Sequence, residues 1–152
     1  MMPSENGYAA PAGARVEIPQ GFAPHFGKSP LTDPWEPLYS RVMDDRIVIG
    51  LWLRPEHTNS RGMAHGGLIA ALADNAMGMS CSAVMQRDGR QMEGKPVTVS
   101  LAIDYVGAAK LGQWVAFDTQ YVRTGRTLCF AQAFVTADDE IIARADAKFR
   151  VL

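Results

Sequence analysis

The sequence predicts an α+β domain in which an antiparallel sheet packs on a single buried helix. Segments with β-strand alternation and one helical segment follow each other in the order strand, helix, four strands. The helical segment, residues 68–79, is apolar or small on nearly every side, as is usual for a buried helix. The last four strand segments are consecutive, which favours hairpin-like antiparallel pairing. With 152 residues, 47% of them hydrophobic, the chain is long enough to enclose one core.

The N-terminal part reads as a lead-in followed by an arm. Residues 1–20 are rich in Pro, Gly and Ala and predict a flexible lead-in, which leaves 21–152 as a single folded domain. Gly and Pro residues interrupt 21–43 repeatedly, so we expect an irregular arm there, with one short helix near 34–40. The aromatic side chains of this arm indicate that it packs on the domain, where it would cover one end of a ligand site.

Alternation with a period of two marks the five strands, residues 46–54, 96–107, 113–123, 126–137 and 140–152. In the second strand, one predicted face carries Val97, Val99, Leu101, Ile103 and Tyr105, and the other carries Thr98, Ser100, Ala102 and Asp104. Thr124-Gly125 predicts a tight hairpin between the third and fourth strands, and residues 137–140 predict the next turn. In the last strand, Ile141 and the alternate residues up to Val151 share an apolar face.

A sheet covers only one side of a helix that is apolar all round. The opposite side needs another cover, and a second copy of the chain would supply it most simply. We therefore expect a homodimer.

Composition and charge exclude several classes of function. The formal net charge of -1 gives no electrostatic reason to expect nucleic acid or an anionic membrane as a partner. The longest apolar run of the helical segment, residues 68–73, is too short to span a bilayer. The first twenty residues lack a basic start followed by an apolar block, so we expect no secretory signal and a cytoplasmic protein.

The cysteines and histidines predict no bound group. Cys81 and Cys129 show no metal or redox spacing and do not suggest a disulfide framework. His25, His57 and His65 lack the spacing of metal ligands. We expect no metal and no cofactor.

Gly66-Gly67 stands where the helical segment should begin. Glycine lets the backbone approach a ligand closely, and the first amides of a helix have no partner within the helix. Aided by the helix dipole, these amides suit an oxygen that carries partial negative charge, as in an oxyanion hole for acyl transfer. A plain loop-to-helix turn would explain the two glycines equally well by themselves.

Asp74 favours the catalytic interpretation. A carboxylate in an apolar helix is costly, and it suits a general base or a nucleophile that attacks an acyl carbon. Capping, or pairing with a buried arginine, is the structural alternative. Gly66 and Asp74 lie eight residues apart, which is about 12 Å along a helix, so one carbonyl group cannot contact both in the same chain. We therefore expect each site to combine Gly66 of one chain with Asp74 of the other.

The segment that begins at His57 carries a longer motif. It reads H-x-N-x-x-G-x-x-H-G-G-x-x-x-x-x-x-D, with the named positions at His57, Asn59, Gly62, His65, Gly66, Gly67 and Asp74. The motif resembles that of the hotdog-fold acyl-CoA thioesterases of the phenylacetic-acid-degradation type, and the resemblance extends from the arm to the C-terminus. It implies a five- to six-stranded antiparallel sheet wrapped around one long central helix. It also implies dimers that often pair into tetramers, and hydrolysis of thioesters of coenzyme A.

The same resemblance implies roles for the residues that chemistry would need. Gly66 would donate its N–H to the thioester oxygen. Asp74 would be the nucleophile or the base that activates water, and Asn59 would orient water or the carbonyl group.

Three further residues follow from the resemblance. His65 would help to hold the oxyanion loop and the thioester, with Gly67 beside it in the substrate site. Thr98 matches a position with a hydroxyl near the attacking water, and in strict alternation it faces away from the Val97 stripe. Ordinary roles stay open for Asn59 in a turn, for His65 as a helix cap and for Thr98 in a strand, and we expect His57 to be structural.

Two other functions stay open. The chain could be a non-catalytic module that binds acyl-CoA, although binding alone would not require the carboxylate of Asp74. It could also be an acyl-thioester dehydratase or hydratase that uses His65 with Asp74, although the order of the motif resembles the thioesterases. The sequence does not distinguish an aryl-acetyl substrate from a short- or medium-chain acyl group.

Overall fold

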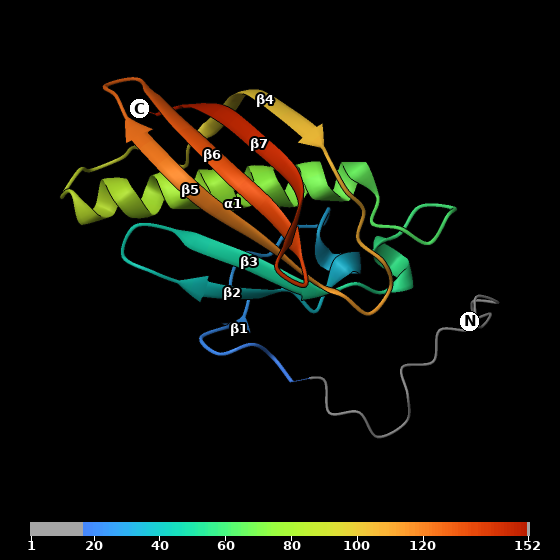
Figure 1. The fold of residues 1–152 in the computed structure, drawn as a ribbon. Helices are drawn as coiled ribbons and strands as arrows, with labels where there is room; N and C mark the ends of the chain where they lie inside the picture. The colour runs from blue at the N-terminus through green and yellow to red at the C-terminus, as the bar shows by residue number, and fades with distance from the viewer. Residues whose placement is uncertain (1–16, 152) are drawn as a thin grey trace.

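Seven antiparallel strands curve around one long helix in the computed structural model, which describes residues 17–151 (Figure 1). The helix, α1, spans Gly66–Arg87. The strands run in the spatial order β1-β2-β3-β5-β6-β7-β4, with the bounds β1 Ala23–Pro24, β2 Tyr39–Val42, β3 Ile47–Trp52, β4 Val97–Tyr105, β5 Trp114–Thr124, β6 Leu128–Ala137 and β7 Glu140–Arg150. The predicted α+β hotdog architecture is confirmed, and most of the predicted lead-in, residues 1–16, lies outside the described residues.

The arm supplies two strands that the sequence analysis missed. The expected helix at 34–40 is wrong: a single 3-10 turn, η1, covers Asp33–Trp35, and the chain then enters β2. Pro37 has no N–H to donate and disfavours helix at the residue before it, which ends the turn early. β2 pairs with β3 and β1 pairs with β2, so the sheet has one or two strands more than expected.

Helix α1 extends eight residues beyond the predicted end at Met79. Cys81, Val84 and Met85 continue its buried side against the sheet. The buried hydroxyl of Ser80 donates to the carbonyl of Ala76 (2.7 Å) and accepts the N–H of Ile47 (3.1 Å), which ties α1 to the start of β3. By length and hydropathy α1 could cross a membrane, but more than half of its apolar window is buried inside the fold, as in a core helix.

A β-bulge in β4 changes which residues face the helix. Thr98 pairs with Phe149 and Ser100 pairs with Lys148, so Val99 is an extra residue between them. Thr98 therefore faces α1, which corrects the prediction that it lies on the same face as Ser100 and Asp104.

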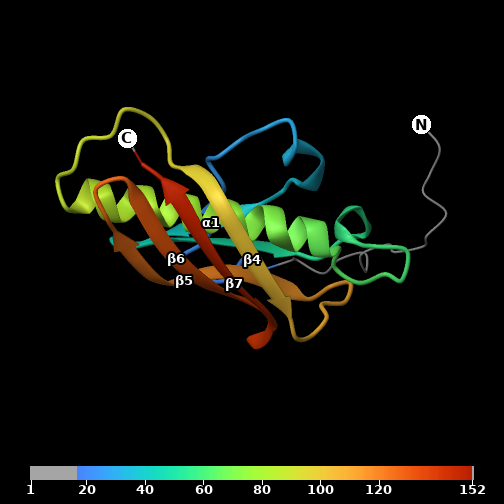
Figure 2. The same cartoon turned by 90° about the horizontal axis from the view of Figure 1, so that it is seen from above.

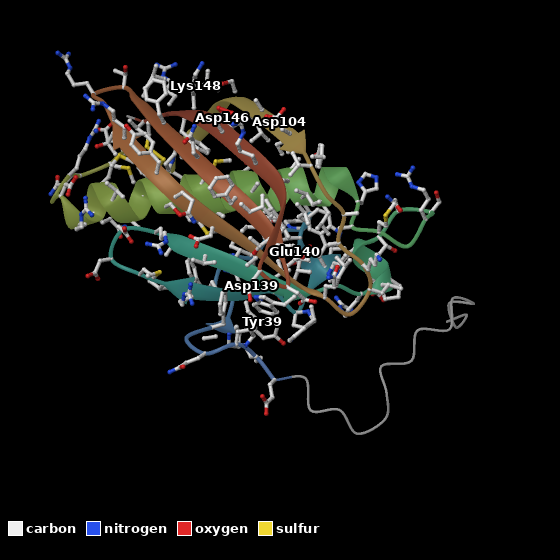
Figure 3. The ribbon with its side chains drawn as sticks, viewed as in Figure 1. Tyr39, Asp104, Asp139, Glu140, Asp146 and Lys148 are labelled. Carbon is white, nitrogen blue, oxygen red and sulfur yellow. A yellow bond between two sulfur atoms is a disulfide. The ribbon has the colours of Figure 1, made fainter. Side chains whose placement is uncertain are left out.

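The outer face of this part of the sheet is polar. Asp104 of β4 and Asp146 and Lys148 of β7 point away from α1 (Figure 3). The predicted alternation therefore holds for the second half of β4 and fails at its first residues.

The turns around the last two strands form as expected, with one shift in register. Asp138 and Asp139 adopt positive φ in the turn between β6 and β7, a conformation that Asp tolerates better than most residues. The register then shifts between Val135 and Thr136, so Ile142 is buried and Ile141 is half exposed. The prediction that Ile141 lies on the apolar face is wrong for this reason.

Cys81 of α1 and Cys129 of β6 are joined as a disulfide in the core. The expectation that the cysteines suggest no disulfide is therefore wrong. The two residues are 48 apart in the sequence, and only the packing of α1 on β6 brings their Cα atoms to 6.5 Å, within the usual range.

Candidate active site

The start of α1 presents a free amide. His65 is the N-cap, and its Nδ1 accepts the N–H of Gly67 at 2.8 Å, so a neutral ring carries its proton on Nε2. A Cβ on Gly67 would lie 3.0 Å from this nitrogen, and glycine therefore permits the cap. Among residues 17–151 the N–H of Gly66 has no acceptor, which leaves it available to a substrate oxygen.

Tyr105, at the end of β4, holds Gly66 from the other side. Its hydroxyl donates to the carbonyl of Gly66 at 2.6 Å, and its ring would lie 3.3 Å from a Cβ on that glycine. Burial raises the pKa of Tyr105 above its ordinary value of 10.0, so the hydroxyl stays a donor at neutral pH. The alternation of the strand predicts Tyr105 in an apolar stripe. The signal it missed is the polar tip of a tyrosine at a strand end.

Asp74 is paired within its own chain. The hydroxyl of Thr98 donates to Oδ1 of Asp74 at 2.7 Å, and the bulge in β4 makes this contact possible. Asp74 lies half-buried on a strip of α1 that the sheet leaves uncovered. The neighbouring residues of this strip are small or polar: Gly67, Ala71 and Asn75.

Asn59 shapes the loop before α1. Its Oδ1 accepts the N–H groups of Arg61 (2.9 Å) and Met63 (3.3 Å), and its own N–H donates to the carbonyl of Met63. Gly62 completes this turn with a φ of +74°, which favours glycine. The side-chain NH₂ of Asn59 is then the group that can turn towards a ligand.

His57 is buried and serves the scaffold, as expected. Its Nδ1 accepts the N–H of Arg54 at 3.0 Å and its Nε2 donates to the carbonyl of Trp35 at 2.8 Å. Its own carbonyl accepts the N–H of His65 at 2.9 Å. His57 therefore connects the arm to the cap of α1, and burial is the main reason that its pKa lies below 6.5.

The structure groups the predicted residues into two half-sites. Asn59, His65, Gly66 and Gly67 gather at the start of α1. Asp74 and Thr98 form a separate pair about 12 Å further along the helix. In the described part of the chain no three His, Cys, Asp or Glu side chains are placed to hold a metal ion.

Comparison with known proteins identifies the family. The thioesterase superfamily domain matches residues 61–143, which include Gly66, Asp74 and Thr98. A candidate esterase of Pseudomonas aeruginosa is 32% identical over 137 residues, which cover 90% of this chain and 98% of that protein. Human acyl-coenzyme A thioesterase 13 is 32% identical over 104 residues, which cover 65% of this chain and 68% of that protein.

Solved structures share the fold. A hypothetical thioesterase from Streptococcus pneumoniae, solved with coenzyme A, superposes with a TM-score of 0.67 at 24% identity and covers 77% of this chain and 90% of that one. The phenylacetic acid degradation protein PaaI from Thermus thermophilus, as an Asn-to-Asp mutant, gives 0.65 at 22% identity and covers 76% and 93%. The predicted thioester hydrolase is confirmed by these relatives: the chain belongs to the thioesterase superfamily.

Proposed function

We propose that the protein hydrolyses acyl-CoA thioesters to a free acid and coenzyme A. The observation that carries this proposal is the combination of a free amide at Gly66 with an Asp74–Thr98 pair on the uncovered strip of α1. A relative named as an acyl-coenzyme A thioesterase and a structural neighbour solved with coenzyme A support the choice of thioester. The acyl groups that we propose are aryl-acetyl or short- to medium-chain.

The active unit that we propose is a homodimer built on β4. This strand is the last of the sheet, and the described residues include no strand beyond it. Its side chains are exposed on both faces, with Val97 at 65% and Val99 at 58%, and Val106, directly after the strand, is 67% exposed. An exposed apolar edge strand invites a further strand, and a second copy of β4 would continue the sheet antiparallel to the first.

Such a dimer brings two antiparallel copies of α1 side by side. The small residues of the uncovered strip, such as Gly67 and Ala71, allow the two helices to approach closely. Gly66 of one protomer would then lie near Asp74 of the partner subunit. This placement removes the separation of about 12 Å that keeps the two groups apart in one chain.

The chemistry follows from these groups. The thioester oxygen would accept the N–H of Gly66, which stabilises the negative charge as the carbonyl carbon becomes tetrahedral. Asp74 would either take a proton from an attacking water or attack the carbonyl carbon itself, and the coenzyme A thiolate would leave. In the second case a water would then hydrolyse the anhydride between the acyl group and Asp74, which releases the free acid and restores the carboxylate. Thr98 would hold Asp74, and the NH₂ of Asn59 would orient the water or the carbonyl group. The Nε2–H of His65 would remain a donor to the thioester.

A dehydratase that used His65 as its base is disfavoured by this geometry. Because Nδ1 of His65 already accepts the N–H of Gly67, neutral His65 offers a proton on Nε2 and no free lone pair. The binding-module alternative gives no reason for Thr98 to hold a carboxylate on the open strip of α1.

We further propose a tetramer, as a dimer of dimers packed through the outer face of the sheet. A shallow hollow of about 350 Å³ lies there, with Tyr121, Phe130 and Ala102 in its lining, and a second dimer would cover this partly apolar surface.

A cytoplasmic location also remains a proposal. The Cys81–Cys129 disulfide is more typical of oxidising compartments. Cell fractionation would decide between the cytoplasm and such a compartment.

The test of the proposed function is thiol release from acetyl-, hexanoyl-, octanoyl-, benzoyl- and phenylacetyl-CoA. Wild type should release thiol from at least one of these, and Asp74→Asn, which keeps the size of the side chain, should lose at least about 100-fold in kcat. Melting temperature and gel filtration would verify that the variant keeps its fold and its assembly. Binding of acyl-CoA without thiol release by wild type would contradict the proposal and favour the binding module.

A further inference from the structure

A cleft of about 430 Å³ opens beside the start of α1. The residues on both sides of Gly66 in the chain, His65 and Gly67, line it, and so do Leu68 and Ala71 from the next turn of the helix. A substrate whose carbonyl oxygen accepts the N–H of Gly66 therefore has this cleft next to its carbonyl carbon. The volume is within the usual range for pockets that enclose small ligands.

The opposite wall of the cleft comes from the arm. Leu31 and Trp35 line it, and Figure 2 shows the arm, in blue, beside the start of α1. Trp35 packs on the core, whereas Leu31 is 65% exposed at the end of its loop. A large aliphatic side chain that lines a cleft and packs on little else is placed to contact a ligand.

Several contacts hold this wall in a defined position. The carbonyl of Trp35 accepts from Nε2 of His57 (2.8 Å) and from a guanidinium nitrogen of Arg54 (3.1 Å). Lys28 and Glu36 form an ion pair at 2.6 Å across the base of the loop that carries Leu31. The arm is thus attached to the same segment that caps α1. This attachment fixes the position of the cleft wall relative to the free N–H of Gly66.

The chemistry of the lining favours one class of acyl group. Leu31, Trp35, Leu68 and Ala71 are apolar, and the charged side chain among the described lining residues is the carboxylate of Glu56. No lysine or arginine of residues 17–151 lines the cleft, and Glu56 is already paired with Arg54 at 3.3 Å, so a free carboxylate at the end of the acyl group would find no cation in the lining.

We propose that the cleft is the acyl pocket and that Leu31 and Trp35 of the arm set its specificity for apolar, uncharged acyl groups. This inference rests on the proposed function. Leu31 limits the space at the far wall, and Trp35 offers an aromatic face to an aryl or alkyl group. Succinyl-type substrates are disfavoured because no cation lines the cleft to pair with their free carboxylate.

The experiment measures kcat/KM for acetyl-, hexanoyl-, octanoyl-, phenylacetyl- and succinyl-CoA with wild type, Leu31→Trp and Leu31→Ala. Because Leu31 is exposed, neither variant should disturb folding. Leu31→Trp narrows the pocket and should lower kcat/KM for octanoyl- or phenylacetyl-CoA about tenfold relative to acetyl-CoA, and Leu31→Ala should shift the preference towards longer chains. Succinyl-CoA should be the poorest substrate throughout.

Phe26→Ala provides a matched control. Phe26 is an apolar residue of the same arm, 60% exposed, and it does not line the cleft. This variant should leave the order of substrates unchanged. If the Leu31 variants alter every substrate by the same factor, or if Phe26→Ala shifts the order equally, the acyl-pocket inference is overturned while thioester hydrolysis stands. If wild type releases no thiol from any substrate, the proposed function fails as well.

Discussion

Thr98 connects strand β4 to the carboxylate of Asp74, which we propose to be catalytic, through a single hydroxyl. Its bond to Asp74 fixes one oxygen of a side chain that otherwise has several rotamers on an open helix surface. The remaining oxygen is free to face water or the substrate. Since reacting groups need to be held in position, this contact should affect turnover more than binding.

Replacement of Thr98 tests this role. Thr98→Val keeps the shape and removes the hydroxyl, and we expect kcat to fall about 10- to 100-fold with little change in KM. Thr98→Ser keeps the hydroxyl and should retain most of the activity. Steady-state kinetics on the best substrate provide the measurement, and equal loss in both variants would show that the hydroxyl does not position Asp74.

At the scale of elements, His57 connects the arm, the loop before α1 and the helix cap. Its Nδ1 accepts a hydrogen bond in the fold, so protonation of the ring would break the contact with Arg54. Burial and the charge of Arg54 lower its pKa, while the Trp35 carbonyl and Glu56 act in the opposite direction. The unfolded chain therefore binds a proton at a higher pH than the folded chain does.

This difference predicts a loss of stability in acid. Below about pH 6.5 His57 binds a proton in the unfolded chain but stays neutral in the folded chain. The free energy of unfolding should therefore fall by up to about 1.4 kcal/mol per pH unit, until the pH reaches the pKa of His57 in the folded chain. Stability should return as the pH rises. Denaturant unfolding at pH 8, 6.5 and 5 provides the measurement.

His57→Asn supplies the matching variant. In this variant the side-chain oxygen can still accept the N–H of Arg54 but does not titrate in this range. The pH dependence of the free energy of unfolding should therefore correspond to about one proton fewer taken up on unfolding, while the free energy of unfolding itself falls. The pKa of buried His25 is also lowered, mainly by burial, so His25 accounts for the pH dependence of stability that remains in the His57→Asn variant. An unchanged slope in His57→Asn would contradict the assignment.

The spacing of apolar residues predicted the long helix and the long strands because it reflects which face of each element is buried. The five strands and α1 occur where the alternation and the apolar helix indicated them. It could not show the bulge at Val99, since one extra residue in a strand leaves the local pattern intact and only moves Thr98 to the helix side. β2 was missed because the neighbouring Pro residues are also typical of loops.

The motif placed Asn59, His65, Gly66 and Gly67 around the start of α1, where the structure has them, and the role of Asp74 stays a prediction. It could not show that Tyr105 supports Gly66 or that Cys81 meets Cys129, because each pair joins segments far apart in the sequence. Such contacts depend on how α1 packs on the sheet, which no local pattern reports.

At the scale of the whole molecule, the separation of the two half-sites predicts a result for mixed dimers. Gly66→Val would bring a side chain against Tyr105 and displace the amide, and Asp74→Asn would remove the carboxylate. Each variant alone should be inactive. A heterodimer of the two, purified through different tags, should regain about half of the wild-type activity, since one of its two sites would be intact.

The two parent proteins, mixed and assayed without subunit exchange, provide the background. A purified heterodimer that stays at this background would show that Gly66 and Asp74 do not combine across chains. Activity in either parent alone would show that the corresponding residue is dispensable.

Strand β4 contacts both half-sites. Thr98, near its start, holds Asp74, and Tyr105, at its end, holds the carbonyl of Gly66. The same strand is the open edge at which we propose that two chains join. Turnover per molecule would then fall on dilution, as protomers separate, and the amount of protein made in the cell would itself set the rate, with no separate regulator required.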